Sequence, residues 1–301
     1  MSDKNTRGVA VIGLGQMGGG IARNLDQAGL LGAVWDPDPT MQAPYRERDD
    51  VAVVPPADLP AGCRRIIFVV PGVTEIAECL TGADAILERM ERGGIILDLT
   101  TSDPGASGEH AAVAAERGVD YLDCGMTGGA AGAEAGTMTL MIGGEAKAIE
   151  ACANIFDAVT GRIFHVGPSG AGHTLKLVHN MVLHTMFLTN VEGVRMAAGM
   201  GIDPETVVEV FNAGNARSFV SEVRFPNHIL SGTWDGRSKV ANLAKDLAMA
   251  TDLSSREGAP TPFGDLTTSI LARALEAGME NTDFTKLYEA FEDISGVADA
   301  N

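Results

Sequence analysis

A single lysine, Lys176, lies in the segment GAGHTLKLVHN (residues 170–180), where polar residues recur at helical spacing. His173, Lys176, Asn180 and His184 follow one another at spacings of three, four and four residues, so the four side chains share one face of a helix. Taken alone, this helix suggests an ordinary surface lysine. If leucines on both sides desolvate it, its pKa falls and it can exchange a proton with a substrate hydroxyl or aldehyde oxygen. Asn180, one turn on, is placed to orient the lysine or the substrate.

A glycine-rich loop follows the first apolar run of the chain and opens a helical pattern; it comprises Gly13, Leu14, Gly15, Gln16, Met17 and Gly18. In a strand–loop–helix context, this Gly-x-Gly-x-x-Gly spacing is typical of dinucleotide binding. Gly13 allows a tight turn and Gly15 removes a side chain where a pyrophosphate must approach. Gly18 lets the helix pack closely, and the N–H groups at the helix start face the phosphates. The loop predicts a nicotinamide dinucleotide cofactor.

Asp36 ends the second predicted strand, 23 residues after Gly13. A carboxylate at about this distance accepts a hydrogen bond from the adenosine ribose 2′-hydroxyl and repels a 2′-phosphate. The following residues are Pro37, Asp38 and Pro39, with no arginine to bind such a phosphate. The pattern favours NAD over NADP. The alternative is that Asp36 only forms a turn before Pro37.

Short apolar strands alternate with helical patterns over the first half of the chain, which indicates a mostly parallel sheet with helices on both faces. One of these helices is expected from about Glu145 to Val159, between the last two strands. After Pro168 the pattern becomes helical, beginning with an unbroken helix from Gly172 to about Ala198 that would be about 40 Å long. We expect two domains, a nucleotide-binding domain at residues 1–168 and an all-α domain at residues 169–301 that includes the long connecting helix.

The chain has 301 residues and a formal net charge of −18, so nucleic acids and anionic membrane surfaces are unfavourable partners. An anionic substrate therefore needs a local cationic or amide-rich pocket.

The four cysteines show neither CxxC nor zinc-ligand spacing, so we expect free buried thiols and no metal site. The polar start MSDKNTRG has no secretory pattern and no apolar run is long enough to span a bilayer, which favours a cytoplasmic location.

Four motifs in register resemble the β-hydroxyacid dehydrogenase family, which includes 3-hydroxyisobutyrate dehydrogenase. They are VAVIGLGQMGGGIARNL near the start, LDCGMTGGAAGAEAGTMTLMIGG (residues 122–144), GAGHTLKLVHN (residues 170–180) and LAKDLAMA (residues 243–250). The resemblance extends from about residue 8 to 296. It implies a Rossmann-type N-terminal domain and a helical C-terminal domain. It also implies hydride transfer between a nicotinamide and a small anionic β-hydroxy acid or its semialdehyde.

The resemblance also assigns roles by motif position. Lys176 falls on the catalytic lysine and Asn180 on its partner. Three residues fall on the segment that cradles the substrate carboxylate: Thr127, Gly128 and Gly129. Val70 and Pro71 fall on the cofactor-binding loop after the fourth strand. Thr101 falls near the nicotinamide ribose, and Lys245 falls on a second lysine near the nicotinamide. Lys245 also falls near the substrate, with a solvated helix residue paired with Asp246 as the alternative. A family-type interface implies a homodimer or homotetramer.

Several departures from the family pattern keep other activities open. Gly125-Met126-Thr127 replaces the usual Pro-Val-Ser, and His179-Asn180 replaces Asn-Asn, as in the related 6-phosphogluconate dehydrogenases. We take His179 as a substrate contact, with a packing role as the alternative. Leu183 stands where those decarboxylating enzymes carry a glutamate, which argues against oxidative decarboxylation. An imine reductase shares the fold and first motif but normally lacks a lysine at position 176. A non-catalytic nucleotide-binding module is disfavoured for the same reason.

Overall fold

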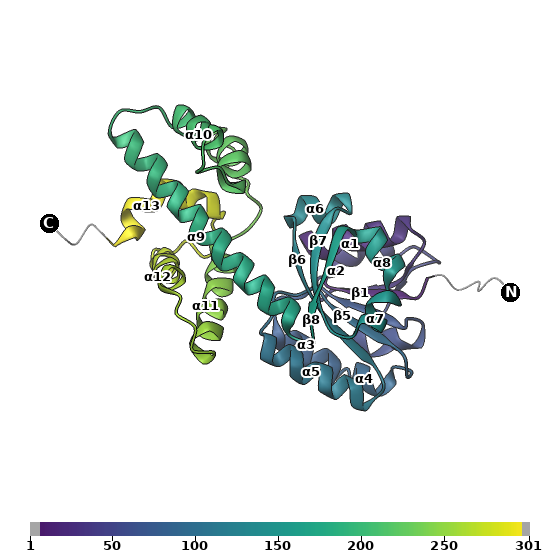
Figure 1. Cartoon of the computed structure of the whole chain (residues 1–301). Coiled ribbons are helices and arrows are strands. Elements are labelled where there is room, and N and C mark those ends of the chain that lie inside the picture. Colours follow the sequence, from purple (N-terminus) through teal and green to yellow (C-terminus); the bar gives the residue numbers. More distant parts are fainter. Residues whose placement is uncertain (1–6, 297–301) are drawn as a thin grey trace. The chain divides into compact units, whose positions relative to one another are not determined.

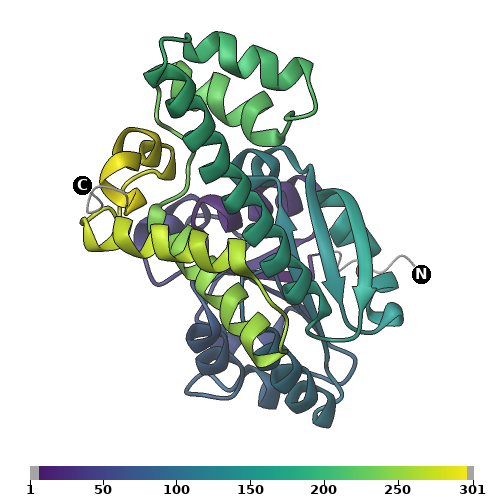
Figure 2. The same ribbon diagram turned by 60° about the vertical axis from the view of Figure 1, so that its left-hand side comes forward.

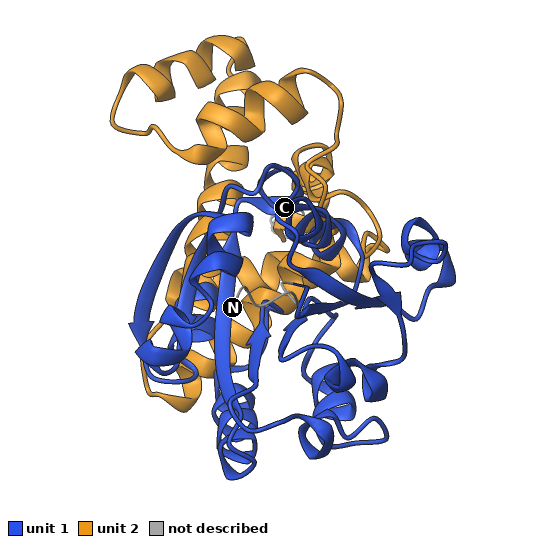
Figure 3. Cartoon of the chain, turned by 90° about the vertical axis from the view of Figure 1, so that its right-hand side faces the viewer, with its two compact units in different colours: residues 1–176 blue, residues 177–301 orange. Residues whose placement is uncertain are grey.

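The computed structural model describes residues 7–296, and the chain divides into two compact units, residues 1–176 and 177–301 (Figure 3). Helix α9 (Ala171–Gly199) begins in the first unit and continues into the second. The domain boundary predicted from the sequence lies between residues 168 and 169, just before this helix. The two compact units divide between residues 176 and 177, inside α9. The units are described separately below.

The first unit is built on an eight-stranded sheet in the order β3-β2-β1-β4-β5-β6-β7-β8. Neighbouring strands from β3 to β6 are parallel, β7 is antiparallel to β6, and β8 is parallel to β7. The mostly parallel sheet predicted from the sequence is confirmed. The strands are β1 (Val9–Ile12), β2 (Leu31–Trp35), β3 (Ala52–Val53), β4 (Arg65–Phe68), β5 (Ile95–Asp98), β6 (Asp120–Thr127), β7 (Met138–Gly143) and β8 (Thr160–Gly167).

Helices cover both faces of this sheet, because its central strands are apolar on both sides (Figure 1). One buried cluster joins the sheet to α1 (Gln16–Gln27), α6 (Gly129–Ala135), α7 (Ala146–Glu150) and α8 (Ala153–Val159). A second cluster joins the other face to α3 (Val73–Leu80), α4 (Ile86–Arg89) and α5 (Pro104–Glu116). The remaining short helices are α2 (Pro39–Gln42), η1 (Ala43–Tyr45) and η2 (Pro56–Ala61).

Two local features differ from the sequence prediction. The helix expected from Glu145 to Val159 is two helices, α7 and α8, separated at Ala151 and Cys152. Helix α6 was not predicted, because its sequence GAAGAEA is rich in glycine, which is a poor helix former. Its position is fixed by tertiary packing against α1, since a Cβ on Gly20 of α1 would lie 2.8 Å from the Ala133 carbonyl carbon.

The second unit is all-helical and has one large apolar cluster to which the buried residues of α9 contribute (Figure 2). Helices α11 and α12 pack side by side, and α13 packs against α12. The elements after α9 are α10 (Pro204–Ala213), the π-helical segment η3 (Val220–Leu230), α11 (Val240–Arg256), α12 (Pro262–Glu276), η4 (Phe284–Lys286) and α13 (Leu287–Ser295). Within residues 7–296, no helix combines the length and apolarity needed to cross a membrane.

A buried carboxylate fixes the start of α9 on the sheet. Asp123, on β6, accepts the N–H of Gly170 at 2.8 Å and the N–H of His173 at 2.9 Å. These are donors that the first turn of a helix leaves without intrahelical partners. Gly172 allows the close approach, because a Cβ there would lie 2.3 Å from the Asp123 carbonyl oxygen and 2.5 Å from that of Met141. The first turn of α9 is therefore held on β6 and β7.

We predict that Asp123→Asn lowers the free energy of unfolding by about 1–3 kcal/mol, because the amide cannot satisfy both buried N–H donors. Urea unfolding followed by circular dichroism measures this loss. The matched control is Asp203→Ala, which removes the exposed cap of α10, where Asp203 accepts the Thr206 N–H at 3.0 Å. That control should cost about 1 kcal/mol. A smaller loss for Asp123→Asn than for the control would contradict the anchoring role of Asp123.

Candidate functional site

The glycine-rich loop has the geometry that phosphate binding requires. Gly13 has a φ of +92°, and a Cβ there would lie 2.2 Å from the Val69 carbonyl oxygen in the loop after β4. A Cβ on Gly18 would lie 1.9 Å from the Gly13 carbonyl oxygen. Gly15 is exposed at the start of α1, its Cβ position is open, and no side chain caps the helix. The free N–H groups and the open position fit a pyrophosphate.

Asp36 is buried and bound to the same loop. Its Oδ2 accepts the Leu14 N–H at 2.7 Å, and its Oδ1 accepts the Asp38 N–H at 2.8 Å. The carboxylate thus stabilises both the nucleotide loop and its own turn. Each oxygen keeps a further lone pair, so this structural role is compatible with an additional hydrogen bond from a ribose hydroxyl.

The other predicted cofactor residues of this unit follow the carboxyl ends of neighbouring parallel strands. Val70 and Pro71 follow β4, and Thr101 follows β5, so they lie at the same sheet edge as the glycine-rich loop after β1. The strand order reverses between β1 and β4, which is where open α/β sheets bind ligands. The sequence did not single out Thr100, whose Oγ1 accepts the Val70 N–H at 3.3 Å and joins the two loops.

The predicted carboxylate cradle follows β6 at this same edge. Thr127 ends β6, and Gly128 and Gly129 lead into α6 with φ angles of +119° and +62°. Asn24 of α1 holds α6 in place, because its Nδ2 donates to the Ala133 carbonyl at 2.7 Å. Helix α1, which follows the glycine-rich loop, therefore also positions α6, which follows Thr127.

Lys176 lies against the strand that leads to Thr127. Its side chain is buried, with 8% exposed, and a Cβ on Gly125 would lie 2.6 Å from the Lys176 Cβ. The glycine at position 125, which departs from the family pattern, thus makes room for this lysine. A buried lysine at the ligand-binding edge of the sheet differs from the surface lysine that the local sequence alone would suggest.

His173 does not join Lys176 in the site, although the two share a helix face. It is fully buried, with Nδ1 2.7 Å from Ser107 Oγ and Nε2 3.3 Å from the Asp98 carbonyl oxygen. The Asp98 carboxylate accepts the Tyr121 hydroxyl at 2.7 Å, and burial, reinforced by Asp98, raises the pKa of Tyr121 well above its usual range. These groups form a buried polar network beneath the start of α9.

In the second unit, Asn180 is held by Asp246, which the sequence indicated only as a partner of Lys245. Asn180 Nδ2 donates to Asp246 Oδ2 at 2.6 Å, and both residues are buried. Asn180 Oδ1 accepts from His179 Nδ1 at 3.2 Å. The Lys245 ammonium lies 3.5 Å from Asp246 Oδ1, and its side chain is 42% exposed. Asp246 therefore connects Asn180 to Lys245, and α9 places Asn180 one turn after Lys176.

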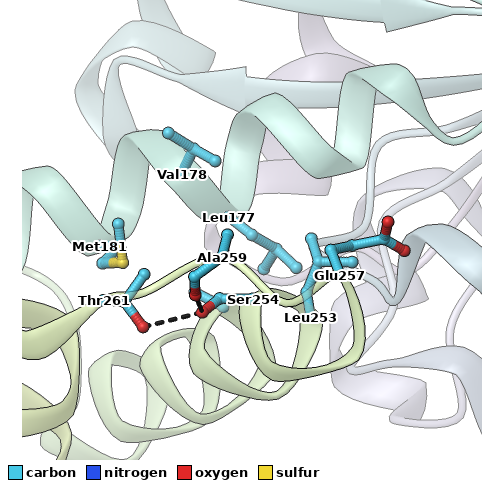
Figure 4. Close-up of a pocket in the computed structure, with 9 residues that line it drawn as sticks. Leu177, Val178, Met181, Leu253, Ser254, Glu257, Ala259 and Thr261 are labelled. Atoms are coloured by element: carbon cyan, nitrogen blue, oxygen red, sulfur yellow. Dashed lines mark hydrogen bonds between the residues drawn. The ribbon is translucent and has the colours of Figure 1, made fainter.

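Other parts of the structure offer less for catalysis. A cavity of about 210 Å³ lies between α9 and the end of α11, lined mainly by apolar residues that include Leu177, Met181 and Leu253 (Figure 4). It contains none of the predicted site residues. The four cysteines are buried and free, as expected, and burial raises the pKa of Cys63 to about 11, so thiolate chemistry is disfavoured. Within residues 7–296, no cluster of three metal-binding side chains is present.

Comparison with known proteins identifies the family. Residues 8–167 match the model for the NAD binding domain of 6-phosphogluconate dehydrogenase, and residues 170–291 match the NAD-binding region of NADP-dependent 3-hydroxyisobutyrate dehydrogenase. The chain is 29% identical to NAD-dependent L-serine dehydrogenase of Pseudomonas aeruginosa, covering 96% of this chain and 99% of that protein. It is 28% identical to 2-(hydroxymethyl)glutarate dehydrogenase of Eubacterium barkeri, covering 96% of each.

Solved structures also match the fold of this chain. The fold matches Mycobacterium tuberculosis 3-hydroxyisobutyrate dehydrogenase with L-serine at a TM-score of 0.86 and 25% identity, over 94% of this chain and 98% of that one. An imine reductase from a Pseudomonas species matches at a TM-score of 0.63 and 21% identity, over 95% of this chain and 100% of that one. The two family models together span nearly the whole chain. The chain therefore belongs to the β-hydroxyacid dehydrogenase family and is an NAD(P)-dependent oxidoreductase.

Proposed function

We propose that the protein oxidises a small β-hydroxy acid of the 3-hydroxyisobutyrate type to its semialdehyde with NAD, or catalyses the reverse reduction. The observation that carries this proposal is the buried Lys176 against Gly125, at the sheet edge that also holds the glycine-rich loop and Thr127. The names of the relatives support a hydroxy acid substrate, since they include enzymes for L-serine, 2-(hydroxymethyl)glutarate and 3-hydroxyisobutyrate.

In this proposal the residues of the chain bind the acid and move one proton. Thr127, Gly128 and Gly129 hold the substrate carboxylate, with His179 and Lys245 as further substrate contacts. Lys176 takes the proton from the substrate hydroxyl during oxidation and returns it to the aldehyde oxygen during reduction. Asn180, held by Asp246, orients the substrate and the lysine. When bound, the nicotinamide accepts or supplies the hydride.

The cofactor proposal is NAD in preference to NADP. Asp36 places a carboxylate beside the Leu14 N–H of the glycine-rich loop, where it would repel a 2′-phosphate. The Pseudomonas aeruginosa relative is named as NAD-dependent, which supports the same choice. Gly13, Gly15 and Gly18 hold the pyrophosphate in this proposal, together with Leu14, Gln16 and Met17. Val70, Pro71, Thr101 and Lys245 lie toward the nicotinamide and its ribose.

The two enzyme alternatives receive less support. Leu183, at the position of the glutamate in the decarboxylating relatives, packs against the apolar cluster of the second unit and carries no proton to transfer. An imine reductase is disfavoured by the buried Lys176. The cytoplasmic location remains a prediction from the sequence.

We propose a homodimer or homotetramer. Leu175, Val178 and Val182 follow one another on α9 at spacings of three and four residues, and they are 39%, 42% and 51% exposed. Phe263 and Leu266 at the start of α12 are also exposed. Exposed apolar residues grouped on a helix are typical of protein interfaces, and a second copy of the chain is the partner that the family resemblance implies.

We predict that Lys176→Ala lowers kcat by about 10²–10⁴-fold, because the proton transfer loses its side chain while the Cβ that packs on Gly125 remains. Binding of NAD should stay within about threefold, as measured by titration calorimetry. NADH absorbance with 3-hydroxyisobutyrate, L-serine, glycerate, threonate and 6-phosphogluconate measures turnover and identifies the substrate. Lys147→Ala, on the exposed face of α7, is the matched control. A kcat for Lys176→Ala within tenfold of wild type would refute the assignment.

We predict that Asp36→Asn shifts the ratio of kcat/KM for NAD over NADP by about 10–100-fold toward NADP, because a charged hydrogen bond to the ribose and the repulsion of the phosphate are both lost. The amide oxygen can still accept the Leu14 N–H, so the contact to the glycine-rich loop is kept, whereas the part-buried Asp38 N–H loses its acceptor. Asp58→Asn, an exposed position in η2, is the control. An unchanged ratio in Asp36→Asn would remove Asp36 from the ribose site.

We predict that Val182→Asp lowers the molar mass measured by light scattering toward that of one chain, because a buried unpaired charge opposes association. Glu192→Lys on an exposed position of the same helix serves as the control. If wild type is already monomeric, the assembly proposal fails.

A further inference from the structure

The His173 side chain joins both ends of the loop between β5 and α5. Its Nε2 lies 3.3 Å from the carbonyl oxygen of Asp98, the last residue of β5, and its Nδ1 lies 2.7 Å from the Oγ of Ser107 near the start of α5. A carbonyl oxygen only accepts, so Nε2 carries a proton, and in the neutral ring Nδ1 accepts the Ser107 hydroxyl. All three residues are at most 1% exposed. His173 therefore holds the loop of residues 99–106 at its two ends.

The same loop is joined to the loop after β4. The Asp98 carboxylate accepts the Thr100 N–H at 2.9 Å, and the Thr100 hydroxyl accepts the Val70 N–H at 3.3 Å. Thr100 is buried, so little water competes for these bonds. The Asp98 carboxylate also accepts the buried hydroxyl of Tyr121 on β6. His173 thus belongs to a buried chain of hydrogen bonds that runs from α9 to the loops after β5 and β4.

These two loops lie where the second half of a dinucleotide would bind. The glycine-rich loop follows β1, and Asp36 follows β2, which pairs with one side of β1. The strands β4 and β5 lie on the other side of β1, beyond the point where the strand order reverses. A dinucleotide with its pyrophosphate at the start of α1 and its adenosine ribose at Asp36 extends its other half over β4 and β5. The loops that His173 supports would therefore hold the nicotinamide.

His173 also lies three residues before Lys176 on α9, and its own N–H is bound by Asp123 at 2.9 Å. In the proposed oxidation, the carbon gives a hydride to the nicotinamide, its oxygen gives a proton to the Lys176 amine, and a C=O bond remains. The two acceptors must therefore reach two atoms that are directly bonded to each other. A misplacement of about 1 Å can cost about 100-fold in rate. A residue that holds the supports of both acceptors fixes the distance between them.

We propose that His173 is a positioning residue for hydride transfer. It holds the loop of residues 99–106, and through this loop the nicotinamide, at a fixed distance from Lys176. This inference rests on the proposed oxidation of a β-hydroxy acid with Lys176 and NAD. In this role His173 contacts neither the substrate nor the cofactor. It keeps the loop in place before the cofactor binds, which reduces the ordering entropy that binding would otherwise cost.

The first test removes both hydrogen bonds and keeps a side chain of similar volume. We expect His173→Leu to lower kcat for L-serine or 3-hydroxyisobutyrate by about 10–100-fold, with KM for the acid within about threefold of wild type. With deuterium at the hydroxymethyl carbon of either acid, the isotope effect on kcat should rise, because hydride transfer becomes the slow step. A variant that is only less stable would keep the wild-type isotope effect. The Ser107 hydroxyl retains the Asp103 carbonyl oxygen as an acceptor at 3.1 Å.

Two amide variants separate the two ends of the loop. The Asn side chain reaches about as far as Nδ1 of histidine and can still bond to Ser107, whereas the Gln side chain reaches about as far as Nε2 and can still donate to the Asp98 carbonyl. Because the Ser107 contact is the shorter one, we expect His173→Asn to retain more kcat than His173→Gln, and both to exceed His173→Leu. Ser107→Ala should lower kcat in the wild-type background and have no further effect in His173→Leu. An equal loss in all three His173 variants would contradict the role of these hydrogen bonds.

Cofactor binding separates this inference from the proposed reaction. Titration calorimetry compares NAD with ADP-ribose, which has the same adenosine and pyrophosphate but no nicotinamide. We expect His173→Leu to weaken NAD binding by about 3–10-fold and ADP-ribose binding by less than about twofold, since only the nicotinamide side must then be ordered on binding. If no hydroxy acid is turned over but this difference is measured, the proposed function fails and the positioning of the nicotinamide loop stands. If hydroxy acids are oxidised and His173→Leu keeps the wild-type kcat, isotope effect and NAD affinity, the positioning role is refuted and the reaction stands.

The control variant is His165→Asn, which changes a histidine of β8 in the same unit. Its Nε2 also contacts backbone carbonyl oxygens, those of Gly144 at 2.9 Å and Gly167 at 3.1 Å. This variant should leave kcat, the isotope effect and cofactor binding unchanged. If His173→Leu does not fold by circular dichroism, His173→Asn and His173→Gln are judged by the same measurements. Equal weakening of NAD and ADP-ribose binding, with an unchanged isotope effect, would show a purely structural role for His173 and would overturn the proposal.

Discussion

The Asp123 carboxylate accepts the first N–H groups of the long helix, and this interaction sets where α9 begins on the sheet. It acts together with two glycines: Gly172 lets the helix backbone approach β6 and β7, and Gly125 receives the Lys176 side chain. Lys176 comes one turn after the capped N–H groups, so its position follows from the same anchor. A buried ionised carboxylate is costly unless its oxygens are hydrogen-bonded. Here the helix start provides those bonds.

The sheet edge with the glycine-rich loop and the loops after β4 and β5 is organised in a similar way, by side-chain hydrogen bonds that join neighbouring loops and helices. Asp36 fixes the glycine-rich loop through the Leu14 N–H, and Thr100 joins the loop after β4 to that after β5. Asn24 connects α1 to α6 and thereby the nucleotide loop to the segment after Thr127. These contacts hold the loops before any ligand arrives, so less ordering entropy is lost on binding.

Charge placement would allow an acidic protein to bind the anionic substrate that we propose. The overall charge of −18 would repel an acid at long range. The cations that we propose as substrate contacts are therefore local: Lys176 is buried at the sheet edge, and Lys245 is held beside Asp246. Burial strengthens the interaction of such groups with a ligand charge, because little water remains to screen them.

The sequence by itself determined the parallel sheet, the glycine-rich loop, the long helix and the family, because these depend on contiguous patterns of apolar spacing, glycine and helix signals. It did not reveal α6, whose helix depends on packing, nor the split of the helix predicted from Glu145 to Val159. Only the tertiary structure paired Asp123 with the start of α9 and Asn180 with Asp246. These partners are separated by 47 and 66 residues, and no local pattern in the sequence shows which distant side chain will satisfy a buried donor.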